Sequence, residues 1–390
     1  MASIADPPVQ TADLYPARNL PEELIFEILS RLPAKSLGRF KSVSKPWRSL
    51  ISSSNFIKTH FRTACGSDDL DHKTIIFKLL LNSPGRFSDV KQCSLSSVVA
   101  PGEAFTSAEL SDSDYLMKDT GNSFRIVGSC DGFVCISVDD GKDLFLWNPC
   151  IKKSKKLRDS YIENRLFRND VLGFGYDELN DDYKAVRLCV HVPSGHVTEV
   201  RVYSLRNDSW RPVGLGKDVL RAGSHSGQYA NGNLHWVMAI YGVISWKFLS
   251  FDLASETFVE IEWPSSKEGL DDWSVGTLRS CLCVLYDYER SYVDLWIMKE
   301  HGVKDSWTKL VSVPYIDLPE NCTSSLPICM LSNDDILLQV GSMLVLYSPK
   351  SKTFRWYPGI NNVVEVSIFT ESLLSPYFHD EEQRQATPVN

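Results

Sequence analysis

The chain has 390 residues, of which 43% are hydrophobic and 23% charged, and its formal net charge is −8. This composition is typical of a globular protein, and the length favours two or three domains. The negative charge argues against broad binding to nucleic acid or to a membrane surface. No apolar run of about 18 residues predicts a transmembrane helix, and residues 1–15 lack a secretory signal. We therefore expect a protein of the cytoplasm or nucleus, with its ten cysteines reduced.

Residues 20–33 predict an amphipathic helix. Five apolar side chains recur along it at helical spacing: Leu24, Ile25, Ile28, Leu29 and Leu32. Asn19 is a candidate N-cap, Pro21 suits the first turn, and Pro33 ends the helix because proline has no N–H to donate.

Shorter helices are expected next. Residues 34–43 predict a second helix, Ser44 a cap for a third, and Asn55 a cap for a fourth short one. So short a segment buries too little of its surface to be stable by itself. It either covers the rest of its own chain or docks onto another protein, and the pattern leaves both open.

After about residue 74 the helical pattern gives way to short β-rich runs, and one unit recurs. Each copy has an aromatic strand, a polar turn and a second strand. The aromatic anchors are Trp147, Tyr203, Phe251, Trp296 and Tyr347, spaced by 56, 48, 45 and 51 residues. A second β-rich element precedes each copy, at residues 132–136, 185–188, 232–237, 281–285 and 336–340. A repeated β unit of about 40–50 residues is typical of a propeller blade.

Five copies are clear, and the ends of the repeat region predict a sixth. Residues 75–81 and 91–99 would form it and residues 363–369 would complete it, so that strands from both ends of the chain close the ring. We therefore expect an α+β multidomain chain, with a small three-helix module followed by an all-β propeller-like domain of about six blades. A pair of β-sandwiches is the alternative.

Four other patterns are candidates for chemistry, and each has a plainer interpretation. The Gly-Phe-Gly run at 173–175 has too few glycines for a dinucleotide loop and predicts a turn. His191 and His196 predict the two sides of an exposed hairpin, since no third ligand completes a metal site. The acidic run 177–182 predicts a solvated loop, and the basic run 152–158 a hairpin turn rather than a nuclear import signal. We expect no catalytic residue, metal or cofactor.

The run from Leu20 to Leu50 resembles the F-box, with dense matches in the same order. The resemblance implies a three-helix module that binds the Skp adaptor of a cullin-based (SCF) ubiquitin ligase. The positions that match the family's adaptor-binding pattern are Leu20, Pro21, Leu24, Leu29, Leu32, Pro33, Leu37, Val43, Ser44, Trp47 and Leu50.

A second resemblance covers the repeats. The segments that are similar to the F-box-associated interaction domain of plant F-box proteins are 146–149, 173–177 with 182–186, and 232–236. Within that family the F-box is similar to regulators of immune-receptor levels, and pollen self-incompatibility proteins share the architecture. The implied organisation is a flexible arm at 1–18, the F-box at 19–62, the β-domain at 74–375 and a disordered tail at 376–390.

The two resemblances imply a non-catalytic substrate receptor. The F-box would dock to the Skp adaptor and, through it, to the cullin, while the β-domain holds an unknown target protein for ubiquitination and proteasomal degradation. A propeller enzyme, such as a glycosidase or an oxidase, is the alternative from another class. A scaffold that binds the adaptor without target turnover is the third possibility.

Overall fold

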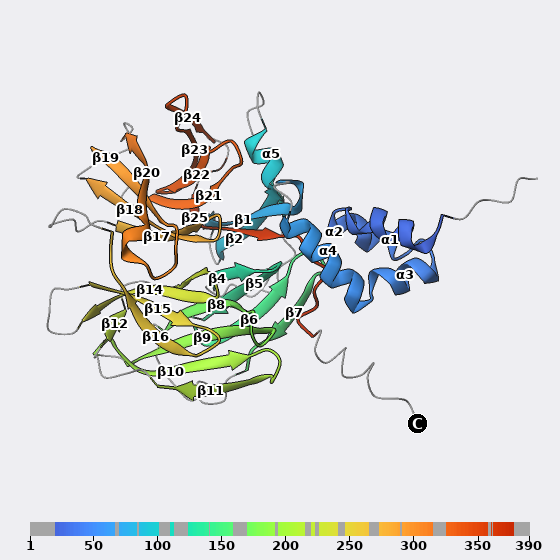
Figure 1. Ribbon diagram of the computed structural model, residues 1–390, viewed down its shortest axis with the longest axis horizontal. Helices are drawn as coiled ribbons and strands as arrows, with labels where there is room; N and C mark the ends of the chain where they lie inside the picture. The colour runs from blue at the N-terminus through green and yellow to red at the C-terminus, as the bar shows by residue number, and fades with distance from the viewer. Residues whose placement is uncertain are drawn as a thin grey trace, which may run out of the picture.

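The computed structural model describes residues 20–66, 70–83, 86–100, 110–112, 124–139, 141–158, 170–191, 194–214, 220–222, 226–240, 246–264, 273–288, 291–314, 325–357, 360 and 362–377. The arm predicted over residues 1–18 lies outside these residues, as does the tail predicted over 376–390 except for its first two residues. A helical N-terminal module projects from one end of a larger β-domain (Figure 1).

Four helices form the N-terminal module: α1 (Glu22–Ser30), α2 (Ala34–Phe40), α3 (Lys45–Ile51) and α4 (Ser54–Gly66). The predicted cap of the third helix is confirmed, because the Trp47 N–H donates to Ser44 Oγ at 3.2 Å. The predicted start of the first helix is only partly right. Pro21 itself occupies the N-cap position of α1, without a side-chain cap, and Asn19 lies outside the described residues.

The fourth helix differs from its prediction in length and in its cap. It has 13 residues, so it is the longest helix of the module rather than a short one. The Phe56 N–H donates to Ser53 Oγ at 3.3 Å, so Ser53 and not Asn55 supplies the capping oxygen. The chain then passes through a short 3₁₀ helix, η1 (Leu70–His72), into the first strand.

The β-domain consists of antiparallel sheets. Four of these sheets have four strands each. The first holds β25 (Val363–Thr370), β1 (Lys73–Ser83), β2 (Arg86–Ser94) and β3 (Ser111–Asp112). The second holds β4 (Phe124–Cys130), β5 (Phe133–Val138), β6 (Asp143–Asn148) and β7 (Lys153–Lys156). The third holds β17 (Trp273–Leu278), β18 (Cys281–Tyr288), β19 (Tyr292–Met298) and β20 (Trp307–Pro314). The fourth holds β21 (Ser325–Met330), β22 (Ile336–Val340), β23 (Met343–Ser348) and β24 (Thr353–Trp356).

A nine-stranded sheet follows the β4–β7 sheet in the sequence and precedes the β17–β20 sheet. Its strands are β8 (Val171–Asp177), β9 (Asp182–His191), β10 (His196–Ser204), β11 (Ser209–Val213), β12 (Leu220–Ala222), β13 (Gln228–Ala230), β14 (Asn233–Ile240), β15 (Trp246–Asp252) and β16 (Thr257–Ile261). Strands β8–β11 and β13–β16 are two meanders, and the short β12 pairs with both β10 and β14. Two further helical pieces are α5 (Leu95–Val99) and η3 (Lys304–Ser306).

The sheets form a propeller. The first strand of each blade or meander contacts that of the next in the cyclic order β25, β4, β8, β13, β17, β21, and β21 contacts β25 again. These strands enclose a cavity of about 530 Å³. The predicted closure of the ring by both chain ends is confirmed, because β25 pairs with β1 from Lys73↔Thr370 to Leu79↔Val363. The alternative of two β-sandwiches is wrong.

One part of the ring-closing prediction fails. Residues 91–99 were expected to help form the sixth blade, but its strand β2 ends at Ser94 and Leu95–Val99 is helix α5. Leu95 and Val98 are buried, and α5 contacts β1, β2 and η1, so packing rather than strand pairing fixes this segment.

The aromatic anchors of the repeat occupy equivalent strands. They lie on the third strand of their blade or meander, namely β6, β10, β15, β19 and β23. All are buried except Trp296, which is half-buried. The anchors therefore form part of the blade cores.

The Gly-Phe-Gly run was expected to be a turn, but it lies in the middle of β8. A Cβ on Gly173 would lie 2.7 Å from the Trp236 ring, and a Cβ on Gly175 would lie 2.3 Å from the Tyr229 ring. These glycines allow aromatic side chains of the neighbouring meander to pack against the backbone of an inner strand.

Candidate functional site

The N-terminal module has a well-packed apolar core. Leu29, Leu37, Ile51 and Phe56 are at most 1% exposed and belong to one apolar cluster. The Phe56 ring meets the Phe26 ring edge to face, with centroids 5.2 Å apart. The helices therefore pack on one another around this core, which residues of the β-domain also enter, and no second protein is needed to close it.

Large apolar side chains nevertheless remain on the outside of this module. Leu20, Leu24, Ile28 and Val43 are 54%, 50%, 51% and 62% exposed. Leu24 and Ile28 lie one turn apart on one face of α1, and Leu20 is exposed just before the N-cap residue Pro21, at the start of the same helix. An exposed apolar row on a small module that is already packed indicates a binding surface.

The structure divides the predicted adaptor-binding set into three groups. The exposed members are Leu20, Pro21, Leu24 and Val43, the half-buried members are Leu32, Pro33, Ser44, Trp47 and Leu50, and the buried members are Leu29 and Leu37. Ile28 is missing from the predicted set although it is as exposed as Leu24. Its place in the apolar stripe of the first helix was the signal that could have included it.

Charge also separates the module from the rest of the chain. Residues 20–66 hold eight Lys and Arg against three Asp and Glu, whereas residues 67–390 hold 32 against 44. The helical module is therefore basic and the remainder of the chain acidic, which favours different partners for the two parts.

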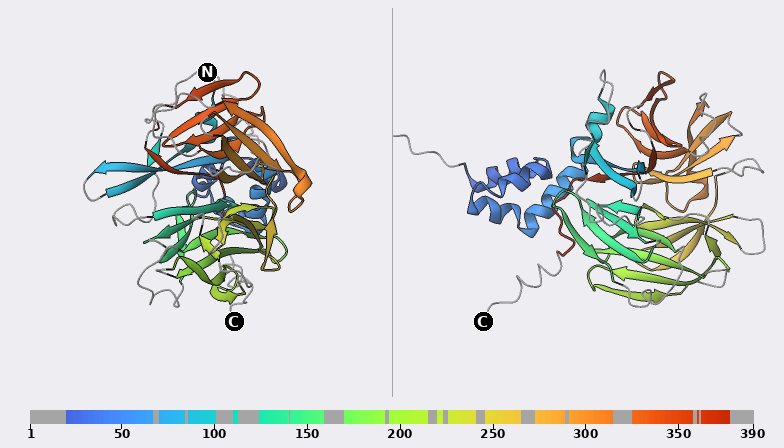
Figure 2. Two further views of the ribbon diagram at one scale, coloured as in Figure 1. Left: turned by 90° about the vertical axis from the view of Figure 1, so that its left-hand side faces the viewer. Right: turned by 180° about the vertical axis from the view of Figure 1, so that it is seen from behind.

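The module is packed onto the β-domain rather than tethered to it. Ile57 and Phe61 of α4 pack on the apolar core between the β4–β7 sheet and the nine-stranded sheet, at the end of the β-domain that Figure 2 shows against the helices. From the other side, Leu373 inserts into the core of the helical module. Lys35 Nζ also lies 3.4 Å from Glu371 Oε1, which is almost fully buried.

Residues 371–375, which follow β25, form a strap between the two parts. Asn148 lies at the end of β6, and its Nδ2 donates to Ser372 O at 3.0 Å and to Leu374 O at 2.8 Å. Beyond the strap, the Tyr377 hydroxyl donates to Ser154 O at 2.9 Å. The buried Asn148 amide therefore fixes the strap that carries Leu373 into the helical core.

Asn148→Ala is expected to lower the free energy of unfolding by about 2 kcal/mol, since it leaves two buried carbonyls without a donor. Asn207→Ala is the control, because Asn207 is exposed on a turn of the same β-domain. Urea denaturation of both variants measures the difference. If Asn148→Ala is as stable as the control, the strap is not held by this side chain.

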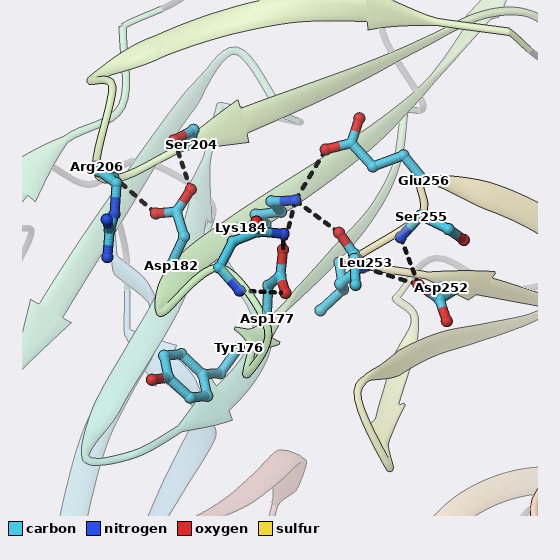
Figure 3. Close-up of polar contacts among 12 residues, drawn as sticks. Tyr176, Asp177, Asp182, Lys184, Ser204, Arg206, Asp252, Leu253, Ser255 and Glu256 are labelled. Atoms are coloured by element: carbon cyan, nitrogen blue, oxygen red, sulfur yellow. Dashed lines mark hydrogen bonds and ion pairs between the residues drawn. The ribbon is translucent and has the colours of Figure 1, made fainter.

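The acidic turn between β8 and β9 is less solvated than predicted. Asp177 and Asp182 are buried. As Figure 3 shows, Lys184 of β9 reaches across to the turn between β15 and β16, and its Nζ lies 2.7 Å from Asp177 Oδ2, 2.9 Å from Glu256 Oε1 and 2.6 Å from Leu253 O. The prediction of a solvated loop holds for residues 178–180, which are exposed. It is wrong for Asp177, which pairs with Lys184, and for Asp182, which accepts from Ser204 Oγ and from the Arg206 N–H.

The titration of these groups follows from the same contacts. Burial acts to raise the pKa of Asp177, but hydrogen bonds from Lys184 and Asn180 outweigh it and hold that pKa below its ordinary value. Burial acts to lower the pKa of Lys184, and the carboxylates of Asp177 and Glu256 raise it instead. Both groups stay charged at neutral pH, so the cluster joins two meanders and offers no proton donor for catalysis.

The remaining sequence candidates are structural. The hairpin predicted at His191 and His196 is confirmed, since these residues pair across β9 and β10. The basic run 152–158 was predicted to be a hairpin turn, but only Lys152 lies in the turn, and Lys153–Lys156 form β7. Lys155 within it is buried, with its Nζ 3.1 Å from Asp208 Oδ1. Within the described ranges, no group of three or more His, Cys, Asp or Glu could hold a metal ion.

The central cavity does not present a catalytic set. Among the described residues that line it, Glu365 is the only carboxylate. Its oxygens already accept from Lys78 Nζ at 2.9 Å and from the Ile126 N–H at 2.7 Å. A glycosidase would need a second carboxylate here.

Sequence reasoning missed a buried histidine contact. The Nε2 atom of His235, on β14, lies 2.9 Å from Nε2 of His301. The other ring nitrogen of His235, Nδ1, lies 3.0 Å from the carbonyl oxygen of Gln228. Burial lowers the pKa of His235 to about 4, and burial also lowers the pKa of His301. The pair is therefore neutral at pH 7.

This pair predicts acid sensitivity. The ordinary pKa of histidine is 6.5 and that of folded His235 is about 4, so the unfolded chain binds more protons between these values. The stability contributed by neutral His235 is fully present above pH 6.5 and falls by about 3 kcal/mol as the pH drops towards 4. His60 and His301, whose pKa values are also lowered, act in the same direction.

Urea denaturation at pH 7.5, 6 and 5 measures this loss. His235→Gln is expected to reduce the slope of stability against pH, and His191→Gln, which changes an exposed histidine, is expected to leave it unchanged. Equal slopes in the wild type and His235→Gln would show that His235 does not titrate in this range.

No helix within the described residues has both the length and the apolar character needed to cross a bilayer.

Comparison with known proteins places this architecture in a family. Residues 18–59 match the model of the F-box domain, and residues 88–362 match that of the F-box associated beta propeller domain. Similar proteins of Arabidopsis thaliana include F-box/kelch-repeat protein At3g23880, 33% identical over 94% of this chain and 98% of the relative. F-box protein CPR1 is 31% identical over 75% of this chain and 73% of its own length. Among solved structures, TolB from Acinetobacter baumannii covers 81% of this chain and 73% of its own, with 9% identity and a TM-score of 0.47.

The fold and the matches define a ligase-adaptor class of protein, with a helical docking module on a propeller. The chain belongs to the plant F-box proteins that carry an F-box-associated propeller domain, which are non-catalytic adaptors. Its F-box implies binding to a Skp adaptor and a role as a receptor in an SCF ubiquitin ligase.

Proposed function

We propose that this protein is the substrate-recognition subunit of an SCF ubiquitin ligase and that it docks to the Skp adaptor through the exposed row Leu20, Leu24 and Ile28. The observation that supports this most is the exposure of that row on a module whose core is already closed. The basic character of residues 20–66 further favours an acidic partner surface.

The predicted adaptor-binding residues then have different roles. Pro21 and Val43 lie at the surface and contact the adaptor beside the apolar row, and the half-buried members contact it at their exposed edges. Leu29 and Leu37 act indirectly, because their buried side chains hold the helices in place.

The β-domain binds a target protein and brings its lysines near a ubiquitin carrier supplied by other subunits. The gain in rate comes from proximity, so no side chain of this chain takes part in the chemistry. A role in immunity, in the cytoplasm or nucleus, rests on the resemblance of the F-box to immune regulators, and the identity of the target would test it.

The propeller is proposed to have six blades. Four are the separate four-stranded sheets, and the meanders β8–β11 and β13–β16 of the nine-stranded sheet count as the other two. The cyclic contacts of the inner strands support this count.

Assembly from purified parts tests the proposed function. The intact chain is mixed with a recombinant Skp adaptor and cullin and analysed by size-exclusion chromatography. A complex of all three is expected, and Leu20→Ala combined with Pro21→Ala is expected to lose the adaptor while the β-domain stays folded. Absence of any complex with the wild-type chain would contradict the proposal. Target half-life with and without proteasome inhibition then separates a degradative receptor from a scaffold.

A further inference from the structure

The central cavity of the propeller is large enough for a small molecule. Its volume of about 530 Å³ lies within the usual range of small-molecule sites, about 300–1,000 Å³. Apolar side chains from the inner strands line part of it, among them Val127, Ile328 and Ile368. Two other lining residues, Leu326 and Val364, are 39% and 42% exposed, so the cavity opens to solvent beside them.

This opening lies at the end of the propeller away from the F-box. Strands β4 and β25 both end beside the strap, because a Cβ on Gly132, in the turn after β4, would lie 2.2 Å from Ser372 Cβ. Val364 lies at the start of β25 and Leu326 at the start of β21. They are neighbours, since Gln339, the partner of Leu326 on β22, donates from Nε2 to Val364 O at 3.4 Å. A molecule can therefore enter without passing the strap or the helical module.

The described residues that line the cavity include one acid and one cation outside the histidine pair, and only the acid is balanced. Glu365 accepts from Lys78 Nζ at 2.9 Å and from the Ile126 N–H at 2.7 Å. Arg125, near the start of β4, is half-buried, and its guanidinium makes no hydrogen bond or ion pair with any described residue. The cavity therefore carries one uncompensated positive charge, although the chain as a whole has a net charge of −8.

A free guanidinium indicates the kind of ligand. Arginine holds a carboxylate by two parallel N–H···O bonds, and these charge-assisted bonds are stronger where water is partly excluded. One positive charge balances one carboxylate, whereas a phosphate monoester carries a charge of about −1.5 to −2 at pH 7. The side chains of Gln228 and Thr277 also line the cavity without a hydrogen bond to any described residue, so they can bind further polar groups of a ligand.

We infer that the central cavity binds a small organic carboxylate, a monoanion with an apolar body, and that Arg125 holds its carboxylate group. The inference goes beyond the proposed function, which gives the β-domain a protein target alone. Because the opening and the F-box lie at opposite ends of the propeller, the carboxylate should bind equally well in the presence and absence of the Skp adaptor.

A matched pair of probes tests the inference on the intact chain. The probes are phenylbutyrate and its uncharged amide, phenylbutyramide, titrated by saturation-transfer NMR. Binding of the carboxylate alone is expected, and Arg125→Gln is expected to weaken it about tenfold, because a charge-assisted hydrogen bond is lost. Arg221→Gln is the matched control, since Arg221 is exposed on β12 and does not line the cavity. Arg125→Met provides a second variant if Arg125→Gln does not fold.

Three results would overturn the inference. The first is equal binding of the two probes, or of neither at millimolar concentration. The second is a phenylbutyrate affinity that Arg125→Gln and Arg125→Met leave unchanged. The third is binding of acetyl-Ala-Glu-Ala-amide in place of phenylbutyrate, which would assign the cavity to a side-chain carboxylate of a protein. Adaptor binding is measured on the same samples, and a wild-type chain that binds phenylbutyrate but not the adaptor contradicts only the proposed function.

Discussion

Replacing Leu24 and Ile28 together by alanine is expected to weaken binding to the Skp adaptor by about 1,000-fold. Each half-exposed side chain would be covered on binding, and its loss costs about 2 kcal/mol. Two such losses correspond to about three decades in Kd. Isothermal titration calorimetry with a recombinant Skp adaptor measures the change.

The fold should survive this double substitution, because both side chains face away from the helical core. Leu29→Ala serves as the contrasting variant, since Leu29 is 1% exposed and its truncation should destabilise the module itself. Leu179→Ala, on the β-domain, should leave the adaptor Kd unchanged. If the double substitution of Leu24 and Ile28 changes the adaptor Kd by less than threefold, this face of α1 is not the docking surface.

Gly132→Ala is expected to lower the free energy of unfolding by about 4 kcal/mol. Gly132 has a φ of +83°, a left-handed conformation that favours glycine. A Cβ at this position would also lie 2.2 Å from Ser372 Cβ and 2.9 Å from Thr370 O. The substitution therefore combines backbone strain with a clash against the strap.

Gly302→Ala separates these two effects. Gly302 has a similar φ of +77°, but nothing lies within 4 Å of its would-be Cβ, so only the strain of about 1 kcal/mol applies. Urea denaturation monitored by tryptophan fluorescence compares the two variants. Equal losses of stability would mean that the strap moves aside without cost. The strap would then not be closely packed between the F-box and the propeller.

Much of the fold could be predicted because its signals are local. Ser44 and Pro46 mark the start of α3 within four residues, and the aromatic anchors recur at nearly constant spacing. The closing strand β25 was foreseeable because an open ring leaves unpaired edges. These features depend on neighbours in the sequence or on the rule that edges must pair.

The features that escaped prediction depend on distant contacts. Gly173 lies in a strand because Trp236, 63 residues away, packs on its backbone. Asp177 is buried because Lys184 joins it to Glu256 on another meander. Periodicity alone identified the apolar stripe of α1, but it could not show that the module would bury Leu29 and leave Ile28 exposed.

Hydrogen exchange of the intact chain with and without a recombinant Skp adaptor tests the central claim most directly. Added protection is expected in the peptides that cover α1 and the turn after α2 at Val43, and the propeller strands should exchange as before. Protection confined to the propeller, or none anywhere at saturating adaptor, would contradict the assignment of the F-box as the docking module.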